Sequence, residues 1–209
     1  IGVVSKLLPR HQGLDEEALA QVKLKQGRGV WGVDLKLVDD AGEVQPWDGT
    51  SRGHLRVRGP WIASGYFKRE GGSPIDEDGF FSTGDVATID ADGYLQLVDR
   101  AKDVIKSGGE WISSIDVENA AMGHPAVAEA AIIGVAHPKW QERPLLIVVP
   151  RAGQVVDRAS ILDFLATRVA KWWLPDDVVF VNELPHTATG KLLKTKLREQ
   201  FRDHVLPDA

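Results

Sequence analysis

The stretch DRAKDVIKSGGEW, residues 99–111, separates two parts of the sequence that differ in character. Before it, short alternating apolar runs are separated by glycine turns, and after it continuous apolar runs alternate with amphipathic segments. The stretch itself holds an arginine between carboxylates, two lysines and two adjacent glycines. Taken alone, it fits a charged connection between two domains as well as it fits a site, because polar linkers commonly join domains. Motifs on either side of it decide between these interpretations.

The composition is that of an ordinary globular protein and excludes several classes of function. The 209 residues are 43% hydrophobic and 26% charged, which suits one large domain or two small ones. The net charge of −5, without a cluster of Lys and Arg, predicts that the chain does not bind nucleic acid. The absence of cysteine excludes disulfides, thiolate metal sites and cysteine nucleophiles, and it agrees with a cytoplasmic location.

Three further features of the sequence narrow the class of protein. The longest apolar runs, such as residues 145–149, are too short to cross a bilayer, so we expect no transmembrane segment. The six histidines show no metal-ligand spacing, so we expect no metal site. The chain begins with Ile1 instead of methionine, from which we expect a piece of a longer protein.

The first half contains four short runs that are typical of strands, and apolar and polar residues alternate in the first two of them. These runs are residues 33–38, 54–58, 86–89 and 94–98. The tetrapeptide DADG at 90–93 joins the last two runs and predicts a hairpin. A short helix is expected over 15–25, where acidic residues come first and lysines last. Residues 1–98 are therefore predicted to form a small β-rich, barrel-like subdomain.

The second half predicts strands that alternate with helices. Continuous apolar runs at 128–135 and 145–149 are typical of strands buried on both faces. A helix is expected to begin after Ser113 or Ser114 as N-cap and to end near Gly123. Its predicted apolar face consists of Ile115, Val117, Ala121 and Met122.

Further elements complete this half of the chain. Short strands are expected at 104–105, 110–112 and 178–181, and helices at 157–172, stopped by Pro175, and at 194–204. The order strand-strand-helix-strand-strand-helix-strand-helix predicts a compact α+β domain over residues 104–209. The fold class expected for the whole chain is α+β, with 99–103 as the connection between its two parts.

Two side chains near the end of the first half are candidates for binding a nucleotide. Asp85, in FSTGD at 81–85, has two acceptor oxygens that suit the hydroxyls of a ribose, although it fits a turn cap as well. Arg100 follows the hairpin strand that begins nine residues after Asp85, so strand pairing would bring the two side chains together. Arginine presents a rigid fork to hydroxyls or phosphate, and an ion pair with Asp85 or Asp99 is an equal alternative.

The segment TATGK, residues 187–191, presents a lysine on a hydroxyl-rich loop. It does not match a P-loop, because Pro185 stands where the first glycine is required and Leu192 follows the lysine. Lys191 is suited to neutralise a phosphate or carboxylate, and a solvated loop lysine is the alternative. The pair Trp172-Trp173 is interpreted as core or as an anchor on a domain surface.

Together these motifs resemble the adenylate-forming superfamily of acyl-CoA synthetases, luciferases and adenylation domains. GHLRVRGPWIASGYF at 53–67 is similar to a family stretch that usually has Glu where this chain has His54. FSTGD resembles the ribose-binding motif, DRAKD at 99–103 the hinge, and PHTATGK at 185–191 the lysine loop. The segments at 106–119 and 123–144 resemble medium- and long-chain fatty acyl-CoA ligases, and the likeness covers the C-terminal third of that family.

The resemblance implies a role for each matching residue. Asp85 and Arg100 would bind the ribose of ATP, and Lys191 would stabilise charge while acyl-AMP and pyrophosphate form. The C-terminal domain would then rotate about Lys102. Another face would line the path of the CoA pantetheine arm, where glycines permit close backbone approach. The residues of that face are Lys106, Gly108, Gly109 and Trp111.

The resemblance also implies the substrates and the limits of this chain. The substrates would be a fatty acid, ATP and CoA, with Mg²⁺ bound largely by a preceding domain that this sequence lacks, and a homodimer is compatible with it. The chain alone is expected to be inactive. An acyl-AMP ligase that delivers to a carrier-protein phosphopantetheine and a non-catalytic interaction module are the alternatives. Asp85, Arg100 and Lys191 together argue against the module.

Overall fold

The computed structural model describes residues 2–67 and 73–207 of an α+β protein. The chain divides into two compact units, Ile1–Lys102 and Asp103–Ala209. The division falls inside the stretch 99–103 that was predicted to connect the two parts. Each unit has its own hydrophobic core, and each is described by itself below.

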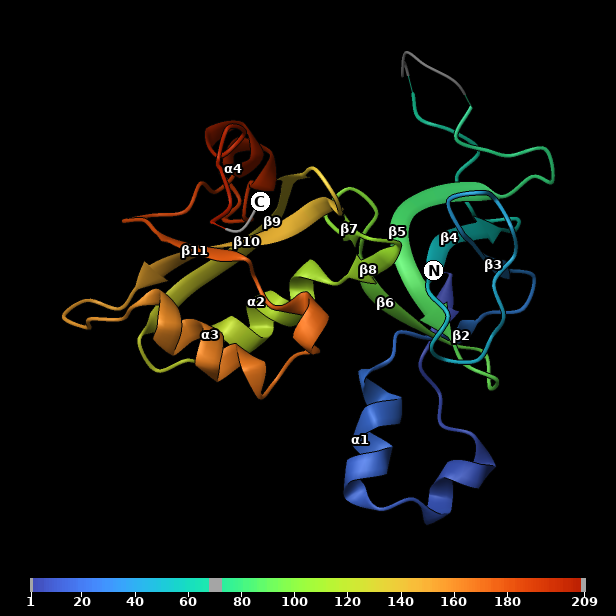
Figure 1. The fold of residues 1–209 in the computed structure, drawn as a ribbon. Helices are drawn as coiled ribbons and strands as arrows, with labels where there is room; N and C mark the ends of the chain where they lie inside the picture. Colours follow the sequence, from blue (N-terminus) through green and yellow to red (C-terminus); the bar gives the residue numbers. More distant parts are fainter. Residues whose placement is uncertain (1, 68–72, 208–209) are drawn as a thin grey trace. The chain divides into compact units, whose positions relative to one another are not determined.

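The first unit is built on one curled, antiparallel six-stranded sheet (Figure 1). Its order is β1-β2-β6-β5-β4-β3, so β1 and β3 form its two edges and the predicted barrel is open. The strands are β1 (Val3–Val4), β2 (Gly27–Gly29), β3 (Asp34–Val38), β4 (Gly53–Arg58), β5 (Phe81–Ile89) and β6 (Tyr94–Arg100). A 3₁₀ helix, η1 (Pro9–Gly13), and α1 (Glu16–Leu24) lie between β1 and β2.

The alternating pattern of the first half places one face of this sheet in the core. Leu37, Leu55, Ala87, Ile89 and Leu95 form the buried cluster. The predicted hairpin joins β5 to β6, and Asp90 Oδ1 accepts hydrogen bonds from the backbone N–H groups of Asp92 and Tyr94. β5 is longer than predicted, because FSTGD forms its first half and pairs partly with β4.

The second unit contains the predicted order of strands and helices. Its elements are β7 (Ile105–Ser107), β8 (Glu110–Ile112), α2 (Ser114–Met122), β9 (Val127–His137), β10 (Gln141–Pro150), α3 (Arg158–Ala166), η2 (Lys171–Trp173), β11 (Asp177–Phe180) and α4 (Lys194–Gln200). β10 pairs antiparallel with β9 and parallel with β11. At its first residue it also pairs with β7.

The central strands of this unit are covered on both faces, which explains their continuous apolar runs. Figure 1 shows α2 and α3 on one face of the β9–β10 sheet and α4 on the other. Ile132, Leu146 and Val148 face the α2–α3 side with Ile161 and Leu165. The residues next to them in sequence point to the α4 side, where Ile133, Leu145 and Ile147 pack with Leu197 and Leu206.

Two helices are shorter than predicted. α3 ends at Ala166 and not at Trp172, because the Phe164 carbonyl accepts from Thr167 Oγ1 and Arg168 Nη1. α4 ends at Gln200, and His204 instead contacts the Asp177 carboxylate at 2.9 Å. Both ends are set by side-chain contacts that the apolar pattern does not encode.

The predicted apolar face of α2 is only half correct. Val117 and Ala121 are buried together with Ser114, at the i, i+3, i+7 spacing of one helix face. Ile115 and Met122 are exposed. At 100° per residue, these two residues, seven positions apart, lie near one another around the helix, on the side away from the buried residues.

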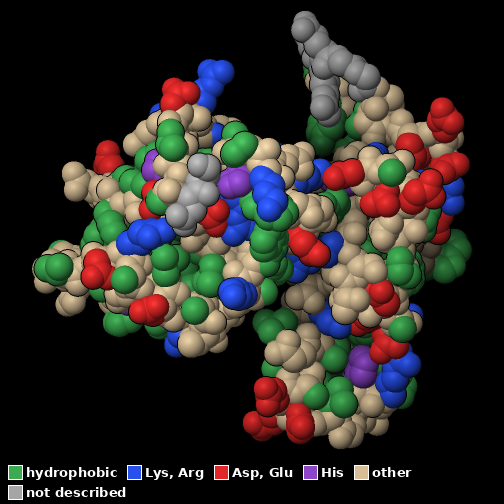
Figure 2. All heavy atoms as spheres, in the orientation of Figure 1, with side chains coloured by type: hydrophobic (Ala, Val, Ile, Leu, Met, Phe, Trp, Pro, Cys, Tyr) green, Lys and Arg blue, Asp and Glu red, His purple; other side chains and the backbone are tan. Residues whose placement is uncertain are grey.

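The surface mixes charges of both signs. On the face shown in Figure 2, Lys and Arg side chains lie among Asp and Glu, without a continuous basic area among the residues drawn in colour. No helix in the described ranges is long and apolar enough to span a membrane.

Candidate functional site

Asp85 and Arg100 form an ion pair where β5 and β6 are in register. Arg100 Nη1 lies 2.6 Å from Asp85 Oδ1, and the Asp85 side chain is 21% exposed. Gly84, at φ +76°, precedes Asp85 at an irregularity in the pairing with β4, and its carbonyl accepts from Ala101 N–H. A glycine in this conformation is typical of a bulge that redirects the next side chain. The hairpin therefore unites these two predicted residues.

A cavity of about 290 Å³ lies beside this pair. It is lined by Thr83, Gly84, Arg100, Ala101 and Lys102. Thr83 Oγ1 accepts from Asp85 N–H and donates to the Leu55 carbonyl, which holds the bulge against β4. The cavity thus offers a guanidinium, a hydroxyl and open backbone next to a carboxylate. Lys102, the predicted hinge residue, is exposed in the turn after β6.

Lys191 stands on a closed turn between β11 and α4. The backbone of Thr187 and Lys191 is hydrogen-bonded at 2.8 Å, and Thr187 Oγ1 accepts from Lys191 N–H at 3.1 Å. A bridge between His186 and Leu192 closes the base of the turn. Lys191 is exposed, and no residue in the described ranges pairs with its Nζ atom. The turn is ordered by its own hydroxyls and presents the ammonium group to solvent.

The two adjacent glycines form the turn of the β7–β8 hairpin and differ in their surroundings. Gly108 has φ +58° and Gly109 has φ +88°, a region that favours glycine. A Cβ on Gly108 would lie 3.0 Å from the Trp140 ring, whereas a Cβ on Gly109 would meet nothing within 4 Å. Lys106 Nζ lies 5.3 Å from the centroid of the Trp111 ring across the hairpin. One side of the turn is therefore packed, and the other is open at Gly109.

Sequence reasoning missed the residues that hold this turn. Trp140 accepts from Gly108 N–H through its carbonyl, and Trp172 donates from Nε1 to the Ser107 carbonyl. Behind them lies Arg143, which is buried and bound to the Asp176 carboxylate. No clear signal for it is present in the sequence, because arginine is mostly exposed in proteins and Arg151, which flanks the same apolar run, is exposed here.

The Lys191 turn and the glycine turn lie at opposite ends of β10. His186, at the base of the Lys191 turn, contacts Glu129, which is in register with Val149. Ser107, at the glycine turn, is in register with Gln141. Eight residues of strand separate these positions, roughly 26 Å at the usual rise. In Figure 1, the β7–β8 hairpin lies toward one end of β10, and the segment between β11 and α4 extends toward the other.

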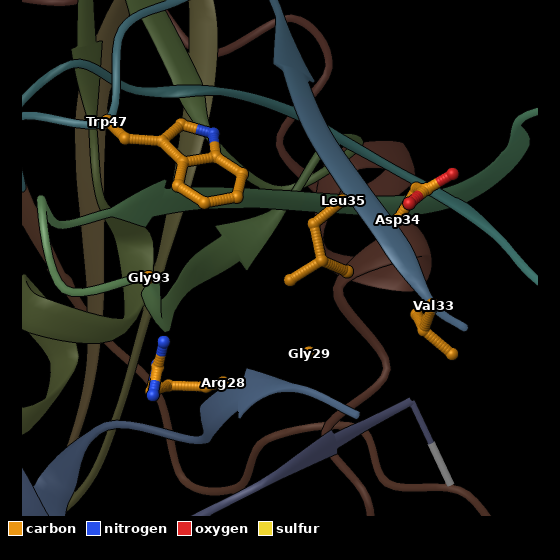
Figure 3. Close-up of a pocket in the computed structure, with 7 residues that line it drawn as sticks. All are labelled: Arg28, Gly29, Val33, Asp34, Leu35, Trp47 and Gly93. Carbon is orange, nitrogen blue, oxygen red and sulfur yellow. The ribbon is translucent and has the colours of Figure 1, made fainter. Parts of the chain in front are cut away.

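A further cavity, of about 220 Å³, lies on the first unit away from the predicted site residues (Figure 3). The Arg28 guanidinium and the Trp47 indole border it, and Leu35 points into it. Asp34 also borders it, but its carboxylate accepts from Arg58 and points away from Trp47. None of its seven lining residues belongs to the predicted site.

The described residues offer no cluster of three His, Asp or Glu side chains that would hold a metal ion. Asp85 is bound to Arg100, Glu142 accepts from Lys106 N–H, and Asp176 is bound to Arg143. These residues do not form a Mg²⁺ site by themselves.

Comparison with known proteins shows that this chain is similar to part of several CoA ligases. Residues 116–191 match the AMP-binding enzyme C-terminal domain family. The chain is 53% identical over 203 residues to 3-methylmercaptopropionyl-CoA ligase of Ruegeria pomeroyi, covering 97% of this chain and 38% of the relative. It is 45% identical over 205 residues to medium-chain-fatty-acid–CoA ligase of Ectopseudomonas oleovorans, covering 98% of this chain and 37% of the relative.

Solved structures agree with these relatives. ATP-bound MatB from Rhodopseudomonas palustris has a TM-score of 0.75 at 32% identity, over 86% of this chain and 36% of that protein. o-Succinylbenzoate CoA synthetase from Bacillus subtilis, in complex with its acyl-adenylate, also has a TM-score of 0.75, at 31% identity, over 88% of this chain and 37% of that protein. The chain spans less than two-fifths of the length of these proteins, within their C-terminal part. The chain is therefore similar to the C-terminal part of acyl-CoA ligases and other adenylate-forming enzymes, and residues 116–191 match their AMP-binding enzyme C-terminal domain.

Proposed function

We propose that this chain is the C-terminal part of an AMP-forming acyl-CoA ligase. In the first half-reaction, a carboxylate oxygen attacks the α-phosphorus of ATP, and pyrophosphate leaves. In the second, the CoA thiolate attacks the acyl carbonyl of acyl-AMP, and AMP leaves. Support comes from the relatives, which are CoA ligases, and from the site residues described above.

The first unit supplies the ribose site in this proposal. Asp85 has two acceptor oxygens, of which Oδ1 is bound to Arg100. A charged acceptor is suited to the two hydroxyls of a ribose, because hydrogen bonds to charged groups are the stronger ones. Arg100 orients the carboxylate from the neighbouring strand and supplies positive charge beside the nucleotide. The bulge at Gly84 keeps the carboxylate at this edge of the sheet.

Lys191 supplies the charge for adenylation. Its ammonium group is exposed and free of ion pairs among the described residues, so it is available to an incoming anion. Negative charge builds up on the carboxylate and α-phosphate as the new bond forms, and a positioned cation stabilises this charge. The ordered turn reduces the entropy that the lysine loses on binding.

The position of the two turns at opposite ends of β10 is the observation that carries the two-step proposal. A reaction centre contacted by Lys191 is out of reach of Gly109 while the second unit keeps its internal structure. The two half-reactions therefore require two placements of this unit, with the change absorbed at residues 99–103 about Lys102. Hinge motions concentrate such changes in a few residues at the ends of elements.

The glycine turn serves the second half-reaction. The open side of Gly109 lets the pantetheine arm pass close to the backbone, with Lys106 and Trp111 beside the hairpin. ATP, CoA and a fatty carboxylate are the proposed substrates. The described residues offer no cluster of carboxylates and histidines for a metal ion, so Mg²⁺ is assigned to the preceding part, and no step is routed through it. A cytoplasmic location and a homodimer complete the proposal.

The test uses the full-length protein with fatty acids of different lengths. Pyrophosphate exchange that depends on the fatty acid supports adenylation, and its absence favours a non-catalytic module. Thioester formation is then compared with free CoA and with a phosphopantetheinyl carrier protein as acceptors. Activity with CoA supports the ligase, and activity with the carrier alone supports the acyl-AMP ligase alternative.

A further inference from the structure

Arg143 is buried in β10, and all five of its N–H donors have acceptors. The side chain is 8% exposed. Nε donates to the Asp176 carboxylate at 2.9 Å, and Nη2 donates to it at 2.6 Å. Nη1 donates to Ser107 Oγ and to the Trp172 carbonyl, both at 3.1 Å, and Nη2 also reaches the Leu174 carbonyl at 3.3 Å. A guanidinium has five donors in a fixed fork, so this arrangement uses all of them.

The acceptors belong to the segments that surround the glycine turn. Ser107 is fully buried and immediately precedes Gly108. Its hydroxyl accepts from Arg143, and its carbonyl accepts from Trp172 Nε1 at 3.3 Å. The guanidinium carbon lies 4.5 Å from the centroid of the Trp172 ring. One cation thus orders both the residue before the turn and the indole that packs on it.

The indoles of Trp140 and Trp172 form the packed side of the turn. Their rings meet edge to face at 5.0 Å, and Gly108 N–H donates to the Trp140 carbonyl at 2.9 Å. An added Cβ on Gly108 would lie within 3.0 Å of Trp140 and 3.4 Å of Trp172. The turn rests directly on the two rings, so a shift of Trp172 moves its support.

Apart from the Gly108 N–H bond to the Trp140 carbonyl, backbone pairing with β10 contributes little to placing this turn. Within the described strands, β7 and β10 are joined at a single register pair, Ser107 with Gln141. The next contact is through a side chain, because Lys106 N–H donates to Glu142 Oε2 at 3.1 Å. The position of the turn therefore depends largely on side-chain groups, among which the buried Arg143 makes the most hydrogen bonds.

We propose that Arg143 is a positioning residue for the thioester-forming half-reaction, acting through Ser107 and Trp172 on the turn at Gly108-Gly109. This inference rests on the proposed function. Arg143 itself touches neither the open side of Gly109 nor the Lys191 turn. Its loss should therefore affect the transfer of the acyl group to CoA and leave adenylation intact.

The test compares variants of the full-length enzyme in the separate half-reactions. Arg143→Lys keeps the charge next to Asp176 but replaces the planar fork with a compact ammonium group. Ser107→Ala removes one acceptor and keeps the Asp176 pair. Conversion of added acyl-AMP and CoA to thioester is expected to fall about 10- to 100-fold in Arg143→Lys, because small misplacements cost rates of this order. A smaller fall is expected in Ser107→Ala, and pyrophosphate exchange should stay at the wild-type rate in both.

A matched control separates positioning from loss of stability. Leu165→Ala opens a cavity in the α2–α3 core of the same unit and removes no hydrogen bond of the turn, and it should lower the melting temperature while preserving the ratio of the two half-reactions. If Arg143→Lys lowers both half-reactions in parallel, as Leu165→Ala does, Arg143 is only a core ion pair and the proposal is wrong. If the wild-type enzyme makes no thioester, the proposed function fails instead. In that case, amide hydrogen exchange at Gly108 and Gly109 still tests whether Arg143 holds the glycine turn. Faster exchange in Arg143→Lys than in the wild type supports this role, and unchanged exchange overturns it.

Discussion

Arg100 Nη1 lies 2.6 Å from Asp85 Oδ1, across a register pair of the β5–β6 hairpin. The arginine side chain is 57% exposed, so the pair by itself adds little to stability, on the order of 0–1 kcal/mol. The pair can therefore be altered with little effect on the stability of the sheet.

Asp85→Asn is expected to weaken adenylation while leaving the fold intact. The amide keeps the shape of the side chain but removes the charge and one acceptor. The loss of a charged hydrogen bond, about 1.5–3 kcal/mol, corresponds to roughly 10- to 100-fold in pyrophosphate exchange at low ATP. Asp34→Asn is the matched control, because it breaks an exposed pair with Arg58 at 2.7 Å in the same sheet. Equal effects of the two substitutions would contradict a ribose-binding role.

Lys191→Ala is expected to slow adenylation and to spare thioester formation, whereas changes at the glycine turn should do the reverse. Removing one charge-stabilising group should slow acyl-AMP formation by roughly two to three orders of magnitude. Conversion of supplied acyl-AMP with CoA should be nearly unchanged, because the Lys191 turn lies at the other end of β10. Lys196→Ala, at an exposed position of α4, is the control. A parallel loss of both half-reactions would refute this division.

Gly109→Leu should obstruct thioester formation and spare pyrophosphate exchange. A Cβ there meets nothing within 4 Å, so the leucine side chain has room to extend into the open side of the turn. The φ of +88° at residue 109 adds backbone strain to this variant. Gly153→Leu is the control for strain, because Gly153 has a φ of +76°, also lies in open space and comes after the far end of β10. Thioester rates that are equal in the two variants would show that strain alone is responsible.

Lys102→Pro is expected to impair one half-reaction far more than the other. Proline fixes φ near −65° and restricts the preceding Ala101, so it should favour one placement of the second unit. Lys102→Ala removes the same side chain but leaves the backbone free, and it should run both steps. Brief proteolysis of the wild-type protein should cut near residues 100–106, because opening concentrates where few contacts cross. Normal rates of both half-reactions in Lys102→Pro, together with a first proteolytic cut elsewhere, would show that residues 99–103 are not a hinge.

Asp76 should make the first unit sensitive to acid. Burial tends to raise the pKa of its carboxyl group, but hydrogen bonds from Phe80 N–H and Lys36 outweigh this and lower the pKa below the usual 3.8. A depressed pKa in the folded state stabilises the protein above the unfolded value and loses this effect as the pH falls through the folded value. Asp76→Asn should therefore lower the melting temperature at pH 7, with a difference from wild type that shrinks below pH 3.8. A difference independent of pH would contradict this account.

Much of the fold follows from short-range patterns. The DADG hairpin, the apolar runs of β9 and β10 and the N-cap at Ser113 were all predicted, because turn chemistry and periodicity act within about ten residues. Helix ends were predicted less well. α3 and α4 stop where Arg168 and His204 find partners, and one of these partners lies on a strand distant in sequence.

By itself, the sequence determined the types and order of the elements, and it singled out Asp85, Arg100, Lys191 and the two glycines as candidates. Only the tertiary structure distinguished Gly108, which packs on two indoles, from the open Gly109, and placed the Lys191 turn at the other end of β10. It alone revealed Arg143 as the support of the glycine turn. The physical reason is that periodicity records which face of an element is buried, whereas register and side-chain contacts between distant segments exist only once the strands pair.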